Sequence, residues 1–425
     1  MPRFKVILEA QSPLLLSDIL PAGNVQSSRL FVAGSVLRGA IAKAILSPLG
    51  LWRHSGQPIQ SISVPEQFHT VFLKEPCARF GFLYPVREAG NMLGDREAFP
   101  LPLTVYTCKT HKGFAGQGGH GVFDRLMEML RQEAGGKTGG RVGCPECDER
   151  LDRMRGYGTR SREDGANTYA QVKIAPRSFV RVGLNRMTET AEERILYTLE
   201  ALVPGTGREG EEKPLSFVGY WVMSPDQWKA LQELLKQHNL AQNGTCLLRI
   251  GTARARGMGL VRLYLQDMST ELPAVEAKLD AFQPKDEKGE PLDRARLYFA
   301  LTLRAPVLLY DSKGQPTTTI TPELLKAYVS QVPGSLEFLS KASVMEQEIW
   351  TGWSPAWGLP KPVTPAMAAG SVLAFRAPME ERNAVLAFLQ EIEENGLGER
   401  LAEGWGEVVA CDPFHIIFDY KGGSQ

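Results

Sequence analysis

The stretches CLLRIGTARARGMGLVRLYL, residues 246–265, and NGLGERLAEGWGEVVAC, residues 395–411, decide the expected fold. The first contains Gly251, five further residues, and then Gly257-Met258-Gly259. The second contains Gly396-Leu397-Gly398, five residues, and then Gly404-Trp405-Gly406. Each loop follows an amphipathic helical pattern and precedes an alternating strand pattern. Two loops of matching spacing at matching places indicate an internal repeat. We call residues 251–259 the first glycine loop and residues 396–406 the second.

The beginnings of the two halves also agree. FKVILEAQSPLLLSD, residues 4–18, and LYFALTLRAPVLLYD, residues 297–311, align around Pro13 and Pro306. Each is an alternating apolar strand followed by a proline turn and an aspartate. Helix starts recur as Ser224-Pro225-Asp226 and Thr321-Pro322-Glu323, with the polar residue as N-cap and proline in the first turn. A further amphipathic helix is predicted over 380–394.

Strand, helix, two strands, helix, strand in each half is the ferredoxin-like (RRM-like) βαββαβ order. We therefore predict an α+β protein with two such domains, residues 1–266 and 295–425. Residues 267–294, rich in charge and proline, are predicted to be the linker. Residues 108–170, rich in glycine and charge, are predicted to be an insertion in the first domain.

Size and composition are those of an ordinary globular protein. The 425 residues suggest two or three domains. No apolar run approaches the ~20 residues that a membrane-spanning helix needs, and the N-terminus reads as a strand, so we expect a cytoplasmic protein. The net charge is zero, with 48 basic and 48 acidic residues. Nucleic-acid binding would therefore need locally clustered arginines or RNA shared with other subunits.

The glycine loops have a chemistry that suits phosphate. Glycine allows close approach of another backbone, and successive N–H groups in such a loop can accept phosphate oxygens. Arg254 and Arg256 lie in the first loop and Arg400 in the second. Arginine makes planar, bidentate contacts to phosphate. The two loops are therefore candidates for binding an RNA backbone.

These residues resemble the RAMP superfamily, whose signature is GhGxxxxxGhG with a basic residue in the middle. Residues 396–406 meet it in full, and residues 251–259 meet all but the first GhG. GSVLRGA, residues 34–40, is similar to the RAMP segment that opens the first helix, with Ser35 as its cap and Arg38 near the RNA. GWSPAWGLPKPVTPAMAAGSVLAF, residues 352–375, resembles the subunit that caps the 5′ handle of CRISPR RNA.

The resemblance implies a subunit of a type III CRISPR effector complex, most like type III-D. Such a subunit would be non-catalytic and would hold the 5′ handle of the CRISPR RNA. It would bridge the large signalling subunit to the backbone RAMP subunits and meet target RNA indirectly. The implied RNA contacts are Arg38, Gly251, Arg254, Arg256, Gly257, Gly259, Lys361, Gly396, Gly398, Arg400, Gly404 and Gly406.

A zinc site is predicted in the insertion. Cys144-Pro145-Glu146-Cys147 is a CxxC knuckle, and Cys108 and two histidines lie upstream. Three thiolates and one imidazole would complete a tetrahedral site that is structural, because no position remains for activated water. The spacing favours His111 as the fourth ligand. The type III-D resemblance of HGVFDRL favours His120, which we prefer.

Catalysis is the main alternative. Some RAMP proteins cut CRISPR RNA by general acid–base chemistry, but none of His54, His69, His238 and His415 lies in a motif that supplies a partner. A RAMP endoribonuclease that processes CRISPR RNA or cuts target RNA remains the runner-up to a non-catalytic subunit. A zinc-stabilised protein-interaction module without RNA is a third hypothesis.

Overall fold

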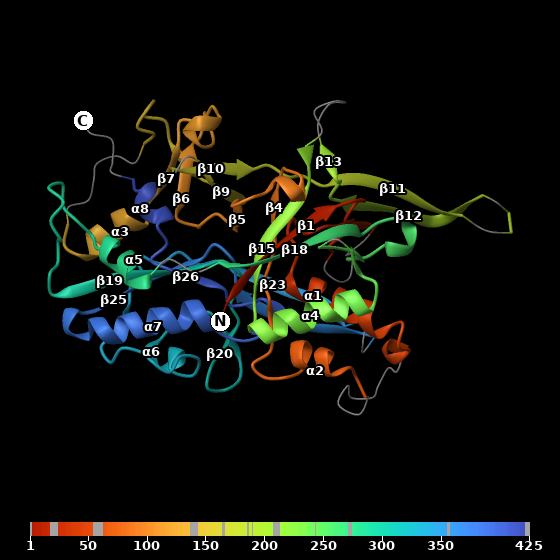
Figure 1. The fold of residues 1–425 in the computed structure, drawn as a ribbon. Coiled ribbons are helices and arrows are strands. Elements are labelled where there is room, and N and C mark those ends of the chain that lie inside the picture. Colours follow the sequence, from red (N-terminus) through yellow and green to blue (C-terminus); the bar gives the residue numbers. More distant parts are fainter. Residues whose placement is uncertain are drawn as a thin grey trace.

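The computed structural model describes residues 2–17, 24–53, 63–136, 143–163, 166–184, 187–188, 190–206, 213–242, 244–270, 274–354 and 358–420. It is a mixed α and β structure with two antiparallel sheets that have their own helices, and with several smaller sheets beside them (Figure 1). Within the described ranges, no helix is long and apolar enough to cross a membrane.

The first sheet is built around β1, which is buried on both faces. Phe4, Val6 and Leu8 pack into the core under the helices, and Ile7 packs on the opposite face with Val218. The strand order is β16-β17-β18-β1-β15-β3, with β4 also paired to β15. The strands are β1 (Arg3–Ala10), β3 (Arg79–Phe80), β4 (Tyr84–Val86), β15 (Ser216–Val222), β16 (Ala241–Gln242), β17 (Thr245–Arg249) and β18 (Leu260–Thr270).

Three helices go with this sheet, namely α1 (Gly34–Leu46), α2 (Glu66–Phe72) and α4 (Pro225–Gln237). Helix α4 begins where its sequence predicted. Ser224 Oγ accepts from the Gln227 N–H at 3.2 Å, and the Gln227 side chain accepts from the Ser224 N–H at 2.9 Å, which completes a capping box. Helix α1 differs from the prediction, because Ala33 is its N-cap and Ser35 makes no capping bond.

The second sheet repeats the core of the first. Its order is β22-β25-β19-β26, so the chain order strand, helix, two strands, helix, strand recurs. The strands are β19 (Arg296–Leu303), β22 (Glu337–Phe338), β25 (Val372–Pro378) and β26 (Val408–Ala410). The helices are α6 (Pro322–Leu325), α7 (Arg382–Asn395) and α8 (Phe414–Ile417), and two hairpins are added, β20 (Leu309–Tyr310) with β21 (Pro316–Thr317) and β23 (Gln347–Ser354) with β24 (Leu359–Met367).

The interval predicted as a linker contains the helix α5 (Val275–Ala281). Its residues Val275 and Leu279, with Phe282 beyond it, are buried in the core of the second sheet. Lys278 of the same helix forms a buried ion pair with Glu393 of α7. The interval is therefore not only a linker: it contains an amphipathic helix that packs in the second half of the molecule.

The segment between β4 and β15 forms three small sheets. These contain β5 (Glu97–Pro100) with β9 (Tyr157–Glu163) and β10 (Ala166–Val172); β6 (Val105–Cys108) with β7 (Val122–Asp124) and β8 (Leu151–Arg153); and β2 (Val25–Ser27) with β11 (Arg177–Leu184) and β12 (Ala191–Ala201). The segment also contains α3 (Leu126–Glu133) and the short pair β13 (Gly205–Thr206) and β14 (Lys213–Pro214).

Much of this inserted segment packs on the second half of the chain, although it interrupts the first. Figure 1 shows β6, β7 and α3 beside α8. Leu126 and Leu130 of α3 lie in the core of the second sheet. Arg131 makes two hydrogen bonds of 2.8 Å to the carboxylate of Asp419. The insertion therefore connects the two halves of the molecule.

Candidate nucleic-acid interface and metal centre

The two glycine loops have the same backbone hydrogen bonds. In the first, the Ile250 N–H donates to the Gly259 carbonyl at 2.9 Å; in the second, the Leu397 N–H donates to the Gly406 carbonyl at 2.9 Å. The next bonds also correspond: the Gly259 N–H donates to Pro13 O at 2.8 Å, and the Gly406 N–H donates to Pro306 O at 2.9 Å. Each loop is thus held by the proline turn at the start of its own half.

Backbone angles give the residue-by-residue register. Ala253 (φ 54°) and Arg400 (φ 59°) both adopt the left-handed conformation, as do Gly257 (φ 80°) and Gly404 (φ 85°). Gly251 therefore corresponds to Gly398. Arg249 and Ile250 then correspond to Gly396 and Leu397, so only the first glycine of the first GhG is missing from the first half.

The same register pairs residues of opposite character. Between the left-handed positions lie one-turn helices, η5 (Arg254–Arg256) and η7 (Leu401–Glu403). Arg254 thus corresponds to Leu401, and Arg256 corresponds to Glu403. The same backbone conformation therefore carries two arginines in the first glycine loop, and an apolar and an acidic side chain in the second.

The second glycine loop is buried between the two halves of the chain. A Cβ at Gly404 would overlap the Phe80 carbonyl of β3 and lie 2.8 Å from Gly81 Cα. Gly34, at the start of α1, is equally crowded, since a Cβ there would lie 2.5 Å from Glu403 O. Trp405 is only 3% exposed. Glycine is needed here so that one backbone can touch another.

The predicted RNA contacts around the second loop have partners within the chain. The Arg400 guanidinium lies 5.1 Å from the centroid of the Trp405 ring and donates to Thr364 Oγ1 at 3.2 Å. Lys361 forms an ion pair with Glu403 at 2.9 Å. Arg38 of α1 donates to the Phe72 carbonyl at 2.8 Å and is also held inside its own half. Each of these three side chains therefore has a partner within the chain.

The first glycine loop carries two arginines, of which Arg254 is half-buried and Arg256 is exposed. Arg256 and Gly257 are exposed, and a Cβ at Gly257 would meet no atom within 4 Å. The Arg256 guanidinium lies 5.2 Å from the Tyr197 ring centroid. Within the described part of the chain, neither Arg254 nor Arg256 has a carboxylate partner. Burial first, and then the charge of Arg254, lowers the pKa of Lys43 on α1. Cations gathered without acids favour binding of an anion.

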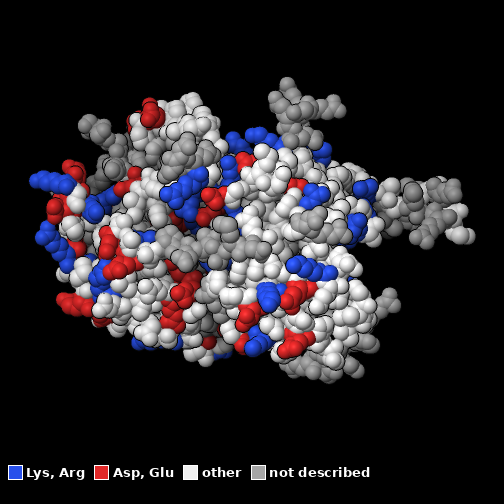
Figure 2. Space-filling view, viewed as in Figure 1, with Lys and Arg blue, Asp and Glu red and all other residues white. Residues whose placement is uncertain are grey.

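The surface as a whole has no single sign of charge. Figure 2 shows basic and acidic side chains interspersed on the face that it presents, in keeping with 48 residues of each sign. Local positive charge at the first glycine loop is therefore the relevant electrostatic feature.

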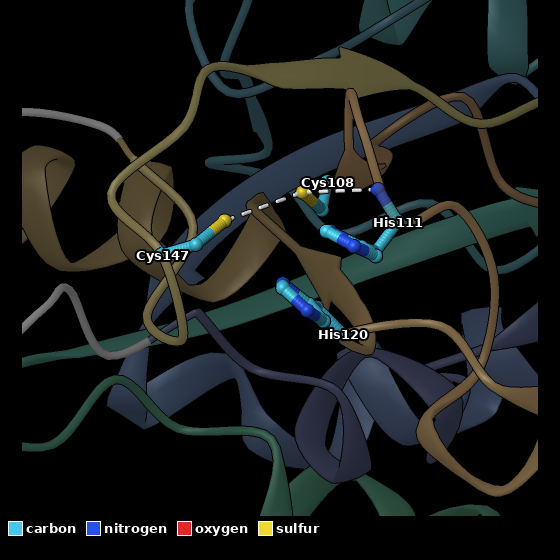
Figure 3. Close-up of side chains that lie close together, drawn as sticks. All are labelled: Cys108, His111, His120 and Cys147. Atoms are coloured by element: carbon cyan, nitrogen blue, oxygen red, sulfur yellow. Dashed lines mark hydrogen bonds between the residues drawn. The ribbon is translucent and has the colours of Figure 1, made fainter.

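The predicted metal ligands come together, and both candidate histidines are among them. Cys108 ends β6, His111 lies in the turn after it, His120 precedes β7, and Cys147 lies in the turn before β8 (Figure 3). Their ligand atoms all lie within 4.8 Å of one another. These four residues form one possible set of metal donors.

Cys144 gives a second set of four. Cys144 Sγ lies 3.6 Å from His120 Nδ1, and Cys108 Sγ lies 3.6 Å from Cys147 Sγ. Tetrahedral zinc with the usual Zn–S and Zn–N bonds holds two sulfurs about 3.8 Å apart and a sulfur and a nitrogen about 3.6 Å apart. The two distances therefore fit the set Cys108, His120, Cys144 and Cys147. His111 stacks on His120 with ring centroids 4.0 Å apart.

The environment of Cys108 suits a thiolate. Burial would raise the pKa of its thiol, but hydrogen bonds from the His111 and Thr110 backbone amides and from the Cys147 side chain outweigh this and lower the pKa. The thiolate is the form that binds metal. Cys108 and Cys144 also pack against Tyr420, whose hydroxyl donates to the Gly143 carbonyl at 2.9 Å. The donor set thus fits a metal ion, and Tyr420 joins the C-terminal segment to the same turn.

A buried histidine network was not predicted from the sequence. His415 Nδ1 lies 2.9 Å from Asp124 Oδ2, and His415 Nε2 lies 2.8 Å from Thr302 Oγ1. The order hydroxyl, imidazole, carboxylate is that of a nucleophilic triad. However, the His415 and Asp124 side chains are 0% exposed, so no substrate can reach them. The network is structural, and only the proximity of distant segments could have revealed it.

Comparisons with known proteins give distant likenesses. No family model and no curated protein matches the chain. A solved chain of type III-B Cmr-beta bound to cognate target RNA and AMPPnP is 11% identical, with a TM-score of 0.40 over 87% of this chain and 86% of that one. A CRISPR associated protein Cas6 is 8% identical, with a TM-score of 0.30 over 96% and 98%. Likenesses this distant do not transfer a residue's role.

Proposed function

We propose that this chain is a non-catalytic RNA-binding subunit of a type III CRISPR effector complex. The observation that carries this proposal is that the two glycine loops have the same backbone conformation but different surroundings. The second joins the halves of the chain, whereas the first is basic, with Arg254 half-buried and Arg256 exposed. The RAMP-like sequence of both loops supports this assignment, as does the strand order that recurs in the two sheets and is expected of ferredoxin-like domains.

The RNA would lie along the first glycine loop. Arg254 and Arg256, with Lys43 nearby, would contact the phosphates, while the backbone N–H groups of a left-handed turn add further donors. The zero net charge favours RNA that is shared with other subunits. The RNA would be the 5′ handle of CRISPR RNA, and the partners would be the large signalling subunit and the backbone subunits, with the subtype most like III-D.

The metal would be structural zinc. We assign Cys108, Cys144, Cys147 and His120 Nδ1 as its ligands, because the two 3.6 Å distances fit a tetrahedral centre. His111 would support His120 by stacking. When bound, zinc would cross-link the turns of the insertion through its coordination bonds and so stabilise their fold. It would take part in no catalytic step.

The experiment is purification of the tagged full chain from its own host with its partners. The double variant R254E/R256E should assemble but lose most of the RNA. R294E is the matched control, because Arg294 is an exposed arginine far along the chain that pairs with Glu290. Retention of RNA by R254E/R256E would contradict the proposal. Specific cleavage of repeat RNA by the pure chain would contradict its non-catalytic part.

A further inference from the structure

A cavity of about 220 Å³ lies between the two halves and the inserted segment. Its walls are aromatic, with Phe31, Phe82, Tyr84 and Tyr157, and its polar side chains are Arg155, Glu346 and Glu348. We propose that it binds one unpaired nucleobase that carries an exocyclic amino group. This inference rests on the proposed RNA-binding function and names the part of the RNA that is read.

The shape of the cavity suits a single planar ring system. Its volume of about 220 Å³ is below the ~300–1,000 Å³ of pockets for drug-sized ligands. Tyr84 and Tyr157 are nearly parallel, 29° apart, with ring centroids separated by 5.6 Å. The Tyr84 hydroxyl is fixed by a hydrogen bond to the Arg304 carbonyl. A pre-formed aromatic wall favours stacking of an unstacked RNA base.

The two carboxylates of the cavity differ in what they can still accept. Both oxygens of Glu346 are engaged, since Arg155 donates to them at 2.7 and 2.5 Å. Glu348 Oε1 accepts a hydrogen bond from Arg29 at 2.7 Å. Glu348 Oε2 has no donor among the described residues. Arg29 is itself held over the Trp350 ring, 3.7 Å from its centroid. Glu348 is therefore a fixed carboxylate with a free acceptor.

A free carboxylate oxygen selects for a base with an amino group. Carboxylates accept from exocyclic amino groups such as that of cytosine, and adenine and guanine also carry one. Uracil has a carbonyl in place of the amino group, and its one remaining donor, N3–H, lies between two carbonyl oxygens that the negative charge of Glu348 would repel. The cavity should therefore favour cytosine, adenine or guanine over uracil.

The chain connects this cavity to the first glycine loop. Arg256 lies over Tyr197 of β12, and β12 pairs with β2 through Thr198 and Val25. From Val25 the chain runs to Phe31 at the cavity. The six residues from Val25 to Phe31 span at most about 20 Å, and β2 lies one strand spacing, about 4.8 Å, from β12. Phosphates held at the loop and a base held in the cavity can thus belong to one short stretch of RNA.

The test is chemical footprinting of the RNA in the complex purified with the full chain. Dimethyl sulfate methylates the Watson–Crick edges of unpaired adenine and cytosine, and kethoxal modifies that of guanine. In the wild type, one unpaired nucleotide should be protected at least tenfold. E348Q should expose it without loss of RNA, and Y157L should do the same by removing the stacking ring. E337Q, which breaks the exposed pair of Glu337 with Arg376, should leave it protected.

The outcomes separate this inference from the proposed function. RNA that is retained, but without any base whose protection depends on Glu348 and Tyr157, would overturn the inference alone. Protection of a uracil, probed with a carbodiimide that modifies its N3, would also overturn it. Absence of RNA from the wild-type complex, or full retention by R254E/R256E, would overturn the proposed function on which it rests.

Discussion

Asp124 and His415 come from opposite halves of the sequence, yet Asp124 Oδ2 lies 2.9 Å from His415 Nδ1 with both side chains fully buried. The hydrogen bonds that Asp124 accepts come from Thr104 Oγ1 at 2.7 Å and from the Leu126 N–H at 2.8 Å. This carboxylate therefore joins the inserted segment, the start of α3 and the C-terminal helix α8.

Replacing the histidine tests whether the network is structural. H415Q should lower the free energy of unfolding by about 1–3 kcal/mol, because it leaves buried polar groups partly unsatisfied. RNA retained per complex should not change. H69Q, at an exposed histidine, is the control for stability. Loss of an RNA-cleaving activity in H415Q, with the fold intact, would contradict the structural role.

The two loops provide a matched pair of glycines. Gly257 and Gly404 have φ of 80° and 85°. Because alanine disfavours this left-handed conformation, it should lower the free energy of unfolding by about 1–2 kcal/mol at either position. Only at Gly404 does the new Cβ also overlap the Phe80 carbonyl. G257A should therefore cost about that penalty, and G404A about 4 kcal/mol or more. Chemical denaturation measures both, and equal losses would contradict the burial of the second loop.

Salt dependence tests the contacts of the first loop. Each phosphate contact to single-stranded nucleic acid contributes about 0.7 to the slope of log affinity against log salt. R254A/R256A should reduce that slope by about 1.4. K326A, at an exposed lysine outside the loop, should not reduce it. Titration of handle RNA into the assembled complex at several salt concentrations provides the measurement, and an unchanged slope would place the RNA elsewhere.

Metal content distinguishes the two histidines. Wild-type protein should contain one zinc per chain by elemental analysis, and H120A and C144S should each lose it. H111A should retain zinc, because we assign His111 a stacking role. C77S is the matched control, since Cys77 is a free cysteine outside the cluster. Zinc that is lost in H111A and kept in C144S would favour the other set of four donors.

Asp412 gives a prediction for pH. Burial would raise the pKa of this carboxyl, but Arg304 and then His415 outweigh it and hold the pKa below its usual range. Because the folded pKa is depressed, the stability from Asp412 is present above the unfolded pKa of about 3.9 and is lost as pH falls through the folded value. D412N should be less stable than wild type at pH 7, and the difference should shrink below about pH 4. D280N, at an exposed ion pair with Arg382, should show a much smaller difference at pH 7.

The local features of the chain were accessible from its sequence. The glycine loops, the Ser224 cap and the cysteine and histidine cluster follow from spacing, because each depends on residues close together in the chain. The contacts that those features make with distant parts of the chain could not be predicted from the sequence. Nothing in residues 396–406 shows that Gly404 meets Phe80, and nothing in the charged interval 267–294 shows that Leu279 is buried. Such contacts depend on how distant segments pack.

The contact of the insertion with the C-terminal segment also has a consequence for synthesis. Asp124 leaves the ribosome nearly 300 residues before His415. At about 5–20 residues per second, that delay is roughly 15–60 s. For the first part of this interval, until β19 and β25 emerge, the apolar face of α3 has no second sheet to cover it. Metal captured by the cysteines and histidines of the nascent insertion would hold its turns in shape until the partner strands emerge, so zinc supply during translation should govern the yield of folded protein.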